Sequence, residues 1–240
     1  MPDPAHHGSE TDDDQQDAPG PLAALRVMAG QEVAVTETLD HIEMYTLEGL
    51  LTLLWHGEAD HRQVVLMLGG AMGGLLGPGK GLYHALGEEL AAEGIGSIRV
   101  NYRSPNDLDR CVHDTLAAAE LAARRGARSF IVLGHSFGGA VAIQAGAALG
   151  DLAAGVVTFA TQAAGAEVAE HLSCPLLLFH GDRDELLPHA ASEMVQMISD
   201  GELVILPGAG HLLTEAEAEI HDRLSTWIPD RLAAHQPPPD

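Results

Sequence analysis

The apolar residues of this chain change their spacing near residue 63. Before that point, apolar and polar residues alternate in two short runs, at 32–37 and at 42–47. The first of these contains Val33 and Val35. A third, apolar run follows at 50–56. Alternation with a period of two is typical of a strand that turns one face to a core and one to water. The three runs therefore predict an antiparallel meander at the start of the fold.

From residue 63 onward, apolar runs of strand length alternate with helix-like segments. Residues 63–68 are apolar almost without interruption, which is typical of a strand buried on both faces. Further strands are predicted at 97–102, 129–133, 155–160, 175–179 and 202–206, and helices at 81–93, 108–125, 140–149, 166–172, 190–199 and 214–234. This order predicts an α/β fold in which helices cover both faces of a mostly parallel central sheet of about eight strands.

The length of 240 residues fits one large domain, which we expect to span residues 22–235. Residues 1–21 hold six acidic residues and no lysine or arginine, so we predict a disordered acidic tail there. The proline-rich end, residues 236–240, is expected to fray.

The charge and the cysteine content of the chain limit which partners it can bind and in which cellular compartment we expect it. The chain has 12 basic and 35 acidic residues, a formal net charge of −23, which argues against nucleic acid and membrane as partners. The two cysteines, Cys111 and Cys174, suggest reduced thiols, and no signal-peptide pattern or membrane-length apolar run is present, so we expect a cytoplasmic protein. The sequence does not indicate an oligomeric state.

The most informative motif lies at residues 134–138, between a predicted strand and a predicted helix. Its sequence is Gly-His-Ser-Phe-Gly, so that glycines flank Ser136 two residues away on each side. A nucleophilic serine on a tight strand-to-helix turn needs such glycines, because neighbouring backbone passes too close for a Cβ. A glycine-rich turn with an incidental serine is the alternative, but the flanking elements and the extra Gly139 favour a nucleophile.

Two further chemical groups follow later strands of the same sheet. Parallel sheets place functional residues at the carboxyl ends of their strands. The strand at 175–179 is followed by a loop with Asp182 and Asp184, and the strand at 202–206 by a loop with His211. Serine, aspartate and histidine at one edge of a sheet are the components of an acyl-transfer triad.

These loops resemble those of the α/β-hydrolase fold superfamily over about residues 30 to 230. Many members carry His-Gly-x-x-Asp-x-x-Val-Pro at the acid loop, and residues 180–188 match this pattern with Leu187 in place of valine. The resemblance makes Ser136, Asp184 and His211 the catalytic residues, and leaves Asp182 to cap a turn or face solvent. The other histidines receive no catalytic role, although His135 is expected to pack or bond beneath the serine.

The same resemblance implies an oxyanion hole and a shallow pocket. One oxyanion donor is the backbone N–H of Phe137, and the other comes from the loop at 69–74, with Ala71 as first choice and Met72 as second. Residues 162–173 leave room for only one short helix where many relatives insert a cap, so the chain is similar to small lidless members such as dienelactone-hydrolase-like proteins and compact carboxylesterases. Met72, Leu186 and Leu187 are the expected pocket walls.

The nucleophile narrows the reaction further. Relatives that cleave epoxides or haloalkanes use aspartate and dienelactone hydrolases proper use cysteine, whereas this chain has Ser136. We therefore expect a carboxylic ester hydrolase that acts on a small or medium neutral acyl substrate without metal or cofactor. A thioesterase or peptidase of the same fold, or a non-catalytic ligand-binding member, is the alternative. Residues 75–84, which carry the single lysine Lys80, form either a mobile rim or the lead-in to a helix.

Overall fold

A computed structural model of the protein describes residues 19–238. Most of the predicted disordered tail therefore lies outside the described residues, and Pro21, which we had placed in that tail, begins the short helix α1 (Pro21–Ala24). Residues 236–238 belong to no helix or strand, and the last two residues of the predicted frayed end are also outside the described part. No helix within residues 19–238 has both the length and the apolar character needed to cross a bilayer.

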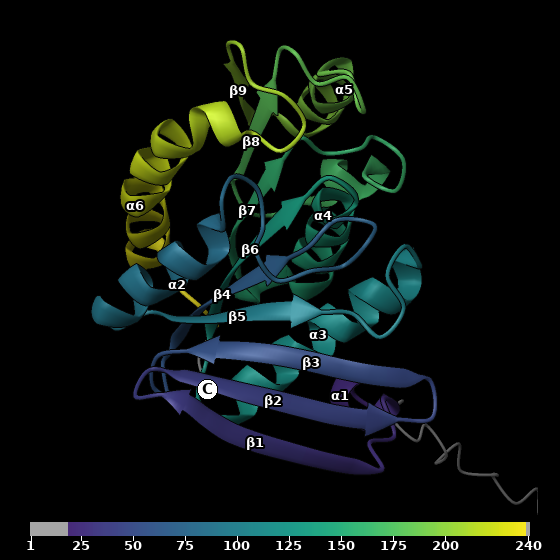
Figure 1. The fold of residues 1–240 in the computed structure, drawn as a ribbon, viewed down its shortest axis with the longest axis vertical. Helices are drawn as coiled ribbons and strands as arrows, with labels where there is room; N and C mark the ends of the chain where they lie inside the picture. Colours follow the sequence, from purple (N-terminus) through teal and green to yellow (C-terminus); the bar gives the residue numbers. More distant parts are fainter. Residues whose placement is uncertain (1–18, 239–240) are drawn as a thin grey trace, which may run out of the picture.

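A single open sheet of nine strands runs through the molecule, one more than the approximate number expected (Figure 1). The strands lie in the order β1-β2-β3-β5-β4-β6-β7-β8-β9. Their bounds are β1 Ala29–Thr36, β2 Leu39–Thr46, β3 Gly49–His56, β4 Gln63–Leu68, β5 Gly96–Asn101, β6 Ser129–His135, β7 Ala153–Phe159, β8 Leu176–Gly181 and β9 Glu202–Leu206. Strands β1 to β3 and the β3–β5 pair are antiparallel, whereas all pairings from β5 through β4 to β9 are parallel. The predicted antiparallel start and parallel centre are both confirmed.

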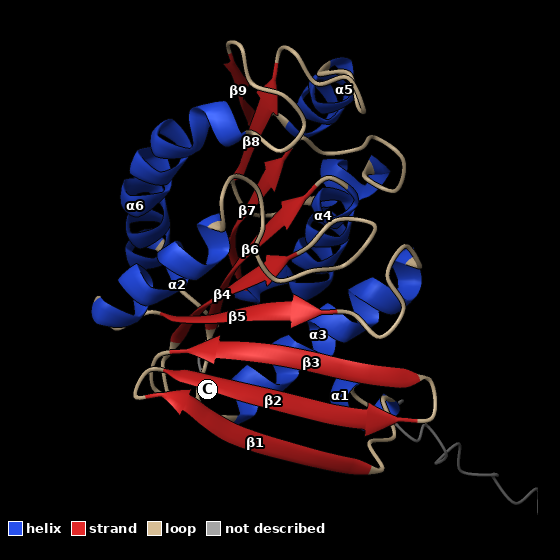
Figure 2. Ribbon diagram, viewed as in Figure 1, coloured by secondary structure: helices blue, strands red, loops and turns tan. Residues whose placement is uncertain are grey.

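Helices cover both faces of the parallel strands, as expected (Figure 2). One face packs against α2 (Leu82–Ala92) and α6 (Glu217–Ala234), and the other against α3 (Leu108–Arg124), α4 (Phe137–Leu149) and α5 (Ala190–Ser199). Short 3₁₀ turns are η1 Gly150–Leu152, η2 Glu167–His171 and η3 Thr214–Ala216. The sheet thus separates two apolar cores, because strands β4, β6, β7 and β8 are buried on both sides.

Most predicted elements differ from the observed ones by one to three residues at an end, and the larger differences are in three helical segments. Helix α4 begins at Phe137, directly after the serine, and not at Ala140. The expected helix at 166–172 is a 3₁₀ turn, and the closing helix is preceded by the 3₁₀ turn η3. At the edge of the sheet, every residue of β1 is exposed, including Val33 and Val35, so its alternation marks a strand but no buried face.

Only η2 and its flanking turns connect β7 to β8, so no cap covers the carboxyl ends of the strands in the described chain. The loops after β4, β6, β8 and β9 meet at this edge. The fold therefore brings the residues singled out from the sequence to one open surface.

Candidate active site

Ser136 occupies a strained turn between β6 and α4. Its backbone has φ 58° and ψ −119°, and its N–H donates to the carbonyl oxygen of Phe159 on β7 at 2.8 Å. A Cβ on Gly134 would collide with the carbonyl oxygen of Gly138, and one on Gly138 with that of Gly69. The two glycines are therefore required by close backbone contacts around the serine.

The structure brings the three predicted catalytic residues together. Ser136 Oγ lies 3.0 Å from Nε2 of His211, and Nδ1 of His211 lies 2.7 Å from Oδ2 of Asp184. In this relay the serine hydroxyl donates to the imidazole, and the imidazole N–H donates to the carboxylate. The three residues follow β6, β8 and β9, whose carboxyl ends lie at the same edge of the sheet.

The Asp184 carboxylate is buried and accepts several hydrogen bonds. Its Oδ1 accepts from the backbone N–H groups of Leu186 at 2.9 Å and Leu187 at 2.8 Å, and its Oδ2 accepts from His211. Burial works to raise the pKa of Asp184, but the hydrogen bonds from Leu187, His211 and Leu186 outweigh it and lower this pKa. The carboxylate is therefore ionised and ready to stabilise an imidazolium.

The rival carboxylate, Asp182, has a different task. Its Oδ1 accepts from the backbone N–H of Gly208 at 2.6 Å, and its side chain lies at the surface. It thereby ties the acid loop to the loop that carries His211, as a turn cap would.

His180 contacts the same carboxylate, a role that sequence reasoning missed. Its Nε2 lies 3.1 Å from Oδ2 of Asp184 and 2.9 Å from the carbonyl oxygen of Leu187, and its Nδ1 lies 2.7 Å from Oγ of Ser192. Because a carbonyl can only accept, the proton is on Nε2 and the Ser192 hydroxyl donates to Nδ1. Burial lowers the pKa of His180, in keeping with this neutral form. The His-Gly-x-x-Asp pattern was the only signal in the sequence that could have indicated this contact.

His135 lies beneath His211. Its Nε2 donates to the backbone carbonyl oxygen of His211 at 2.9 Å, and the two rings are 5.1 Å apart. Burial lowers the pKa of His135 to about 4, so it is neutral near pH 7. It can thus fix the position of the His211 backbone without repelling an imidazolium.

The predicted oxyanion donors flank Ser136. Phe137 is the first residue of α4, so its N–H has no partner inside the helix. Ala71 lies in a turn closed by a 2.9 Å hydrogen bond from the N–H of Gly73 to the carbonyl of Gly70. A Cβ on Gly70 would lie only 3.6 Å from the Cβ of Ser136, so this turn touches the serine. The choice of Phe137 and Ala71 as donors stays a prediction.

Two buried tyrosines hold the start of this turn, which the sequence did not reveal. The Tyr83 hydroxyl donates to the carbonyl of Leu68 at 3.1 Å, and the Tyr102 hydroxyl to that of Gly69 at 3.4 Å. They anchor the end of β4 from α2 and from the residue after β5.

An open cavity of about 460 Å³ surrounds Ser136 and His211. Met72 and Leu186, two of the predicted walls, line it, together with Leu76 and Leu212. Leu187, the third predicted wall residue, does not line the cavity; its carbonyl oxygen instead accepts from His180.

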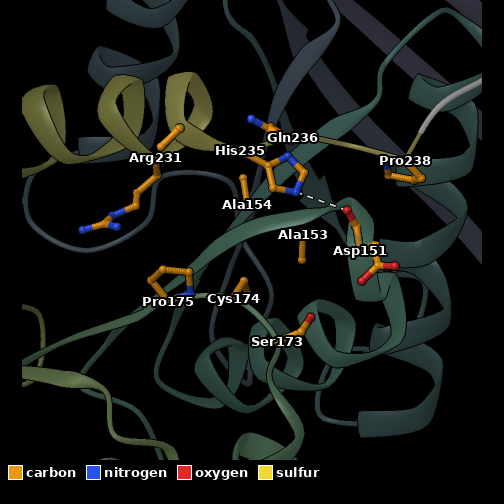
Figure 3. A pocket seen from close by; sticks show the side chains of 11 residues that line it. Asp151, Ala153, Ala154, Ser173, Cys174, Pro175, Arg231, His235, Gln236 and Pro238 are labelled. Atoms are coloured by element: carbon orange, nitrogen blue, oxygen red, sulfur yellow. Dashed lines mark hydrogen bonds between the residues drawn. The ribbon is translucent and has the colours of Figure 1, made fainter.

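A second pocket of about 420 Å³ lies at the opposite edge of the sheet, where β7 begins (Figure 3). There Nε2 of His235 donates to the carbonyl oxygen of Asp151 at 3.1 Å, and Ser173 and Cys174 line the pocket. Burial raises the pKa of Cys174 to about 11, so the thiol is protonated near pH 7.

Within residues 19–238 no group of three or more His, Cys, Asp or Glu side chains could hold a metal ion. The cavity at Ser136 is the candidate active site because the hydrogen-bonded pair of Ser136 and His211 lines it.

The chain belongs to the dienelactone hydrolase family, whose family model matches residues 83–227, more than half of its length. The resemblance expected from the sequence is thereby confirmed. A comparison with curated proteins gave no match.

Solved structures with the same fold include several hydrolases. Est1E from Butyrivibrio proteoclasticus superposes with a TM-score of 0.69 at 16% identity, covering 80% of this chain and 99% of that one. Dienelactone hydrolase from Anabaena variabilis superposes with a TM-score of 0.67 at 20% identity, covering 84% of this chain and 98% of that one. XC6422 from Xanthomonas campestris, described as a serine hydrolase without lid, superposes with a TM-score of 0.64 at 19% identity. The match covers 82% of this chain and 98% of that one. The family supports a hydrolase, and these neighbours share the fold.

Proposed function

We propose that this protein hydrolyses a carboxylic ester of a small or medium neutral substrate through an acyl-serine intermediate. The observation that carries the proposal is the relay from Ser136 through His211 to Asp184, with contacts of 3.0 and 2.7 Å. Both distances are those of hydrogen bonds ready for proton transfer.

In the first half of the reaction, Ser136 Oγ attacks the ester carbonyl carbon and passes its proton to Nε2 of His211. The tetrahedral intermediate then expels the alcohol, which takes that proton as the carbon–oxygen bond breaks. In the second half, a water molecule attacks the acyl group and gives a proton to His211. Ser136 leaves with the proton returned from His211, and the carboxylic acid is released.

Three features stabilise the charges that develop. The ionised Asp184 holds the tautomer of His211 and offsets the imidazolium charge. The N–H groups of Phe137 and Ala71 are the donors we assign to the oxyanion, and α4 directs the positive end of its dipole at the same point. Removing one such donor typically lowers kcat by about 10² to 10³. The reaction needs no metal or cofactor.

Thioesters and amides could enter the same relay, so a thioesterase or a peptidase remains the second candidate. A binding protein without turnover is a candidate of a different class, and the intact relay of Ser136, His211 and Asp184 favours catalysis over it. We further propose a cytoplasmic location, supported by Cys111 and Cys174, which are both free thiols.

The test is reaction with a fluorophosphonate probe, read by intact mass. We expect one adduct on the wild type and none on Ser136→Ala. The control Ser225→Ala removes a hydroxyl that donates to the carbonyl oxygen of His221 on α6 and does not line the cavity, so it should also give one adduct. An unlabelled wild type would overturn the proposal. Matched oxygen and sulfur esters of one acyl group would then separate an esterase from a thioesterase.

A further inference from the structure

Large apolar side chains surround the candidate catalytic serine and yet face solvent. Four of them line the cavity, and their exposed fractions are 94% for Met72, 63% for Leu76, 73% for Leu186 and 58% for Leu212. We call these four residues the apolar collar. Exposed apolar groups that gather in one place mark surfaces that bind something.

The collar is also free of charged side chains. None of the cavity-lining residues in the described part of the chain is Asp, Glu, Lys or Arg. This is unusual in a chain with 35 acidic residues and a net charge of −23. A carboxylate on the acyl group of a substrate would find no cation in the wall and would lose hydration on entering.

Hydrogen bonds fix the backbone beneath three collar residues. The carbonyl oxygen of Leu212 accepts from the N–H of Gly79 at 2.6 Å, and that of Leu76 accepts from the N–H of Tyr83 at 3.1 Å. The N–H of Leu186 donates to Asp184 at 2.9 Å. The fourth, Met72, lies inside the turn closed between Gly70 and Gly73. The exposure of these side chains is therefore a feature of fixed loops.

The segment before α2 is shaped to present Leu76 beside Leu212. Gly77 and Gly79 both have positive φ, at 74° and 67°. A Cβ on Gly77 would lie 2.5 Å from the ring of Tyr83, and one on Gly79 would lie 2.9 Å from the side chain of Glu217. Glycine is thus needed at both positions, which explains why this segment is rich in it.

We infer that the acyl group of the natural substrate is an uncharged hydrocarbon chain that lies across the apolar collar. This inference rests on the proposed function, because it specifies the substrate of the same site. Each methylene that the collar removes from water contributes about a two- to fourfold gain in kcat/KM, the upper value holding for complete burial. An acyl group that ends in a carboxylate must in addition lose hydration at its charged end, which offsets this gain.

The experiment compares para-nitrophenyl esters with acetyl, butanoyl, hexanoyl and octanoyl groups, each kept below its aggregation limit. We expect kcat/KM to rise from acetyl to octanoyl in the wild type. The double variant Leu76→Ser with Leu212→Ser should flatten this rise. The control Met197→Ser removes an apolar side chain on α5 that is even more exposed, at 81%. Met197 does not line the cavity, so this variant should keep the wild-type slope.

A second arm replaces the hexanoyl ester by the adipoyl half-ester, which has the same chain with a terminal carboxylate. We expect kcat/KM to fall by at least tenfold. Equal rates for these two esters, or a flat or falling series from acetyl to octanoyl, would overturn the inference while leaving the esterase proposal intact. Absence of Ser136-dependent hydrolysis of every ester, acetyl included, would instead overturn the proposed function and this inference with it.

Discussion

His180 Nε2 lies 3.1 Å from Oδ2 of Asp184, the oxygen that also accepts from His211. The carboxylate therefore contacts His211, which lines the cavity, and His180, which is buried in the protein interior. We expect His180→Leu to raise the pKa of Asp184, because a donor to the charged form is lost. A more basic carboxylate also stabilises the imidazolium form of the base more strongly, so the acid limb of the pH profile of kcat/KM should move to higher pH.

The matched control for this prediction is His189→Leu, which changes a half-buried histidine paired with Glu193 beside the same loop. It should leave the acid limb in place. An unshifted limb in His180→Leu, in a variant that unfolds like the wild type, would reduce His180 to a packing residue.

The two aspartates of the acid loop offer a paired test of the triad. Asp184→Asn removes the charge that stabilises the imidazolium and should lower kcat by about 10⁴-fold. Asp182→Asn keeps an oxygen that can accept from Gly208 and should change kcat by less than about threefold. Steady-state kinetics on one activated ester decides between them, and equal losses in both variants would contradict the assignment.

The second oxyanion donor can be located by deleting backbone N–H groups. Ala71→Pro removes the N–H that we assign to the oxyanion, and should lower kcat by about 10² to 10³ with little change in KM. Met72→Pro deletes the neighbouring N–H and serves as the control. If Met72→Pro is the variant that loses kcat, the donor is one residue later in the loop. Thermal unfolding of both variants shows whether the turn has survived.

A buried histidine outside the site makes stability depend on pH. His56 on β3 is fully buried, and neither of its ring nitrogens has a hydrogen-bond partner among the described residues. Burial, with help from Arg99 and His84, lowers the pKa of His56 from 6.5 to about 4. The unfolded chain therefore binds this proton more readily, and stability falls as the pH drops from about 6.5 toward 4.

We expect His56→Leu to reduce the stability lost between about pH 7.5 and 4.5 by on the order of 2.5 kcal/mol. Urea unfolding at both pH values measures this difference. His171→Leu, at an exposed histidine in η2, should lose as much stability on acidification as the wild type. The same loss in His56→Leu as in the wild type would mean that His56 is not the group that titrates.

The sequence could predict that the candidate catalytic residues lie at one edge of the sheet, because this placement follows from chain order. A loop that directly follows a parallel strand must emerge at the carboxyl edge, so Ser136 and His211 could be placed at one edge without knowing any contact. Gly134 and Gly138 identified the turn, since their missing side chains are required by nearby backbone. These signals are local in the sequence.

Contacts between residues that are far apart in the sequence could not be predicted from these local patterns. The bond from His180 to Ser192 and the anchoring of Leu68 by Tyr83 depend on how α5 and α2 pack on the sheet. Leu187 was an expected wall of the cavity, but it lies in the tight acid loop, where its carbonyl oxygen accepts from His180. The alternation of apolar and polar residues around Val33 correctly predicted a strand. A strand face is buried only where another layer covers it, however, and β1 is exposed along its whole length.

The backbone of Ser136 has a consequence for the engineering of this protein. A non-glycine residue at φ 58° and ψ −119° costs about 1 to 3 kcal/mol, which the surrounding contacts must offset. Glycine adopts such angles without that cost, so Ser136→Gly is expected to melt at a higher temperature while lacking all Ser136-dependent turnover. A selection for heat resistance alone would thus favour loss of the proposed nucleophile, and any programme to stabilise this protein has to screen for activity at every round.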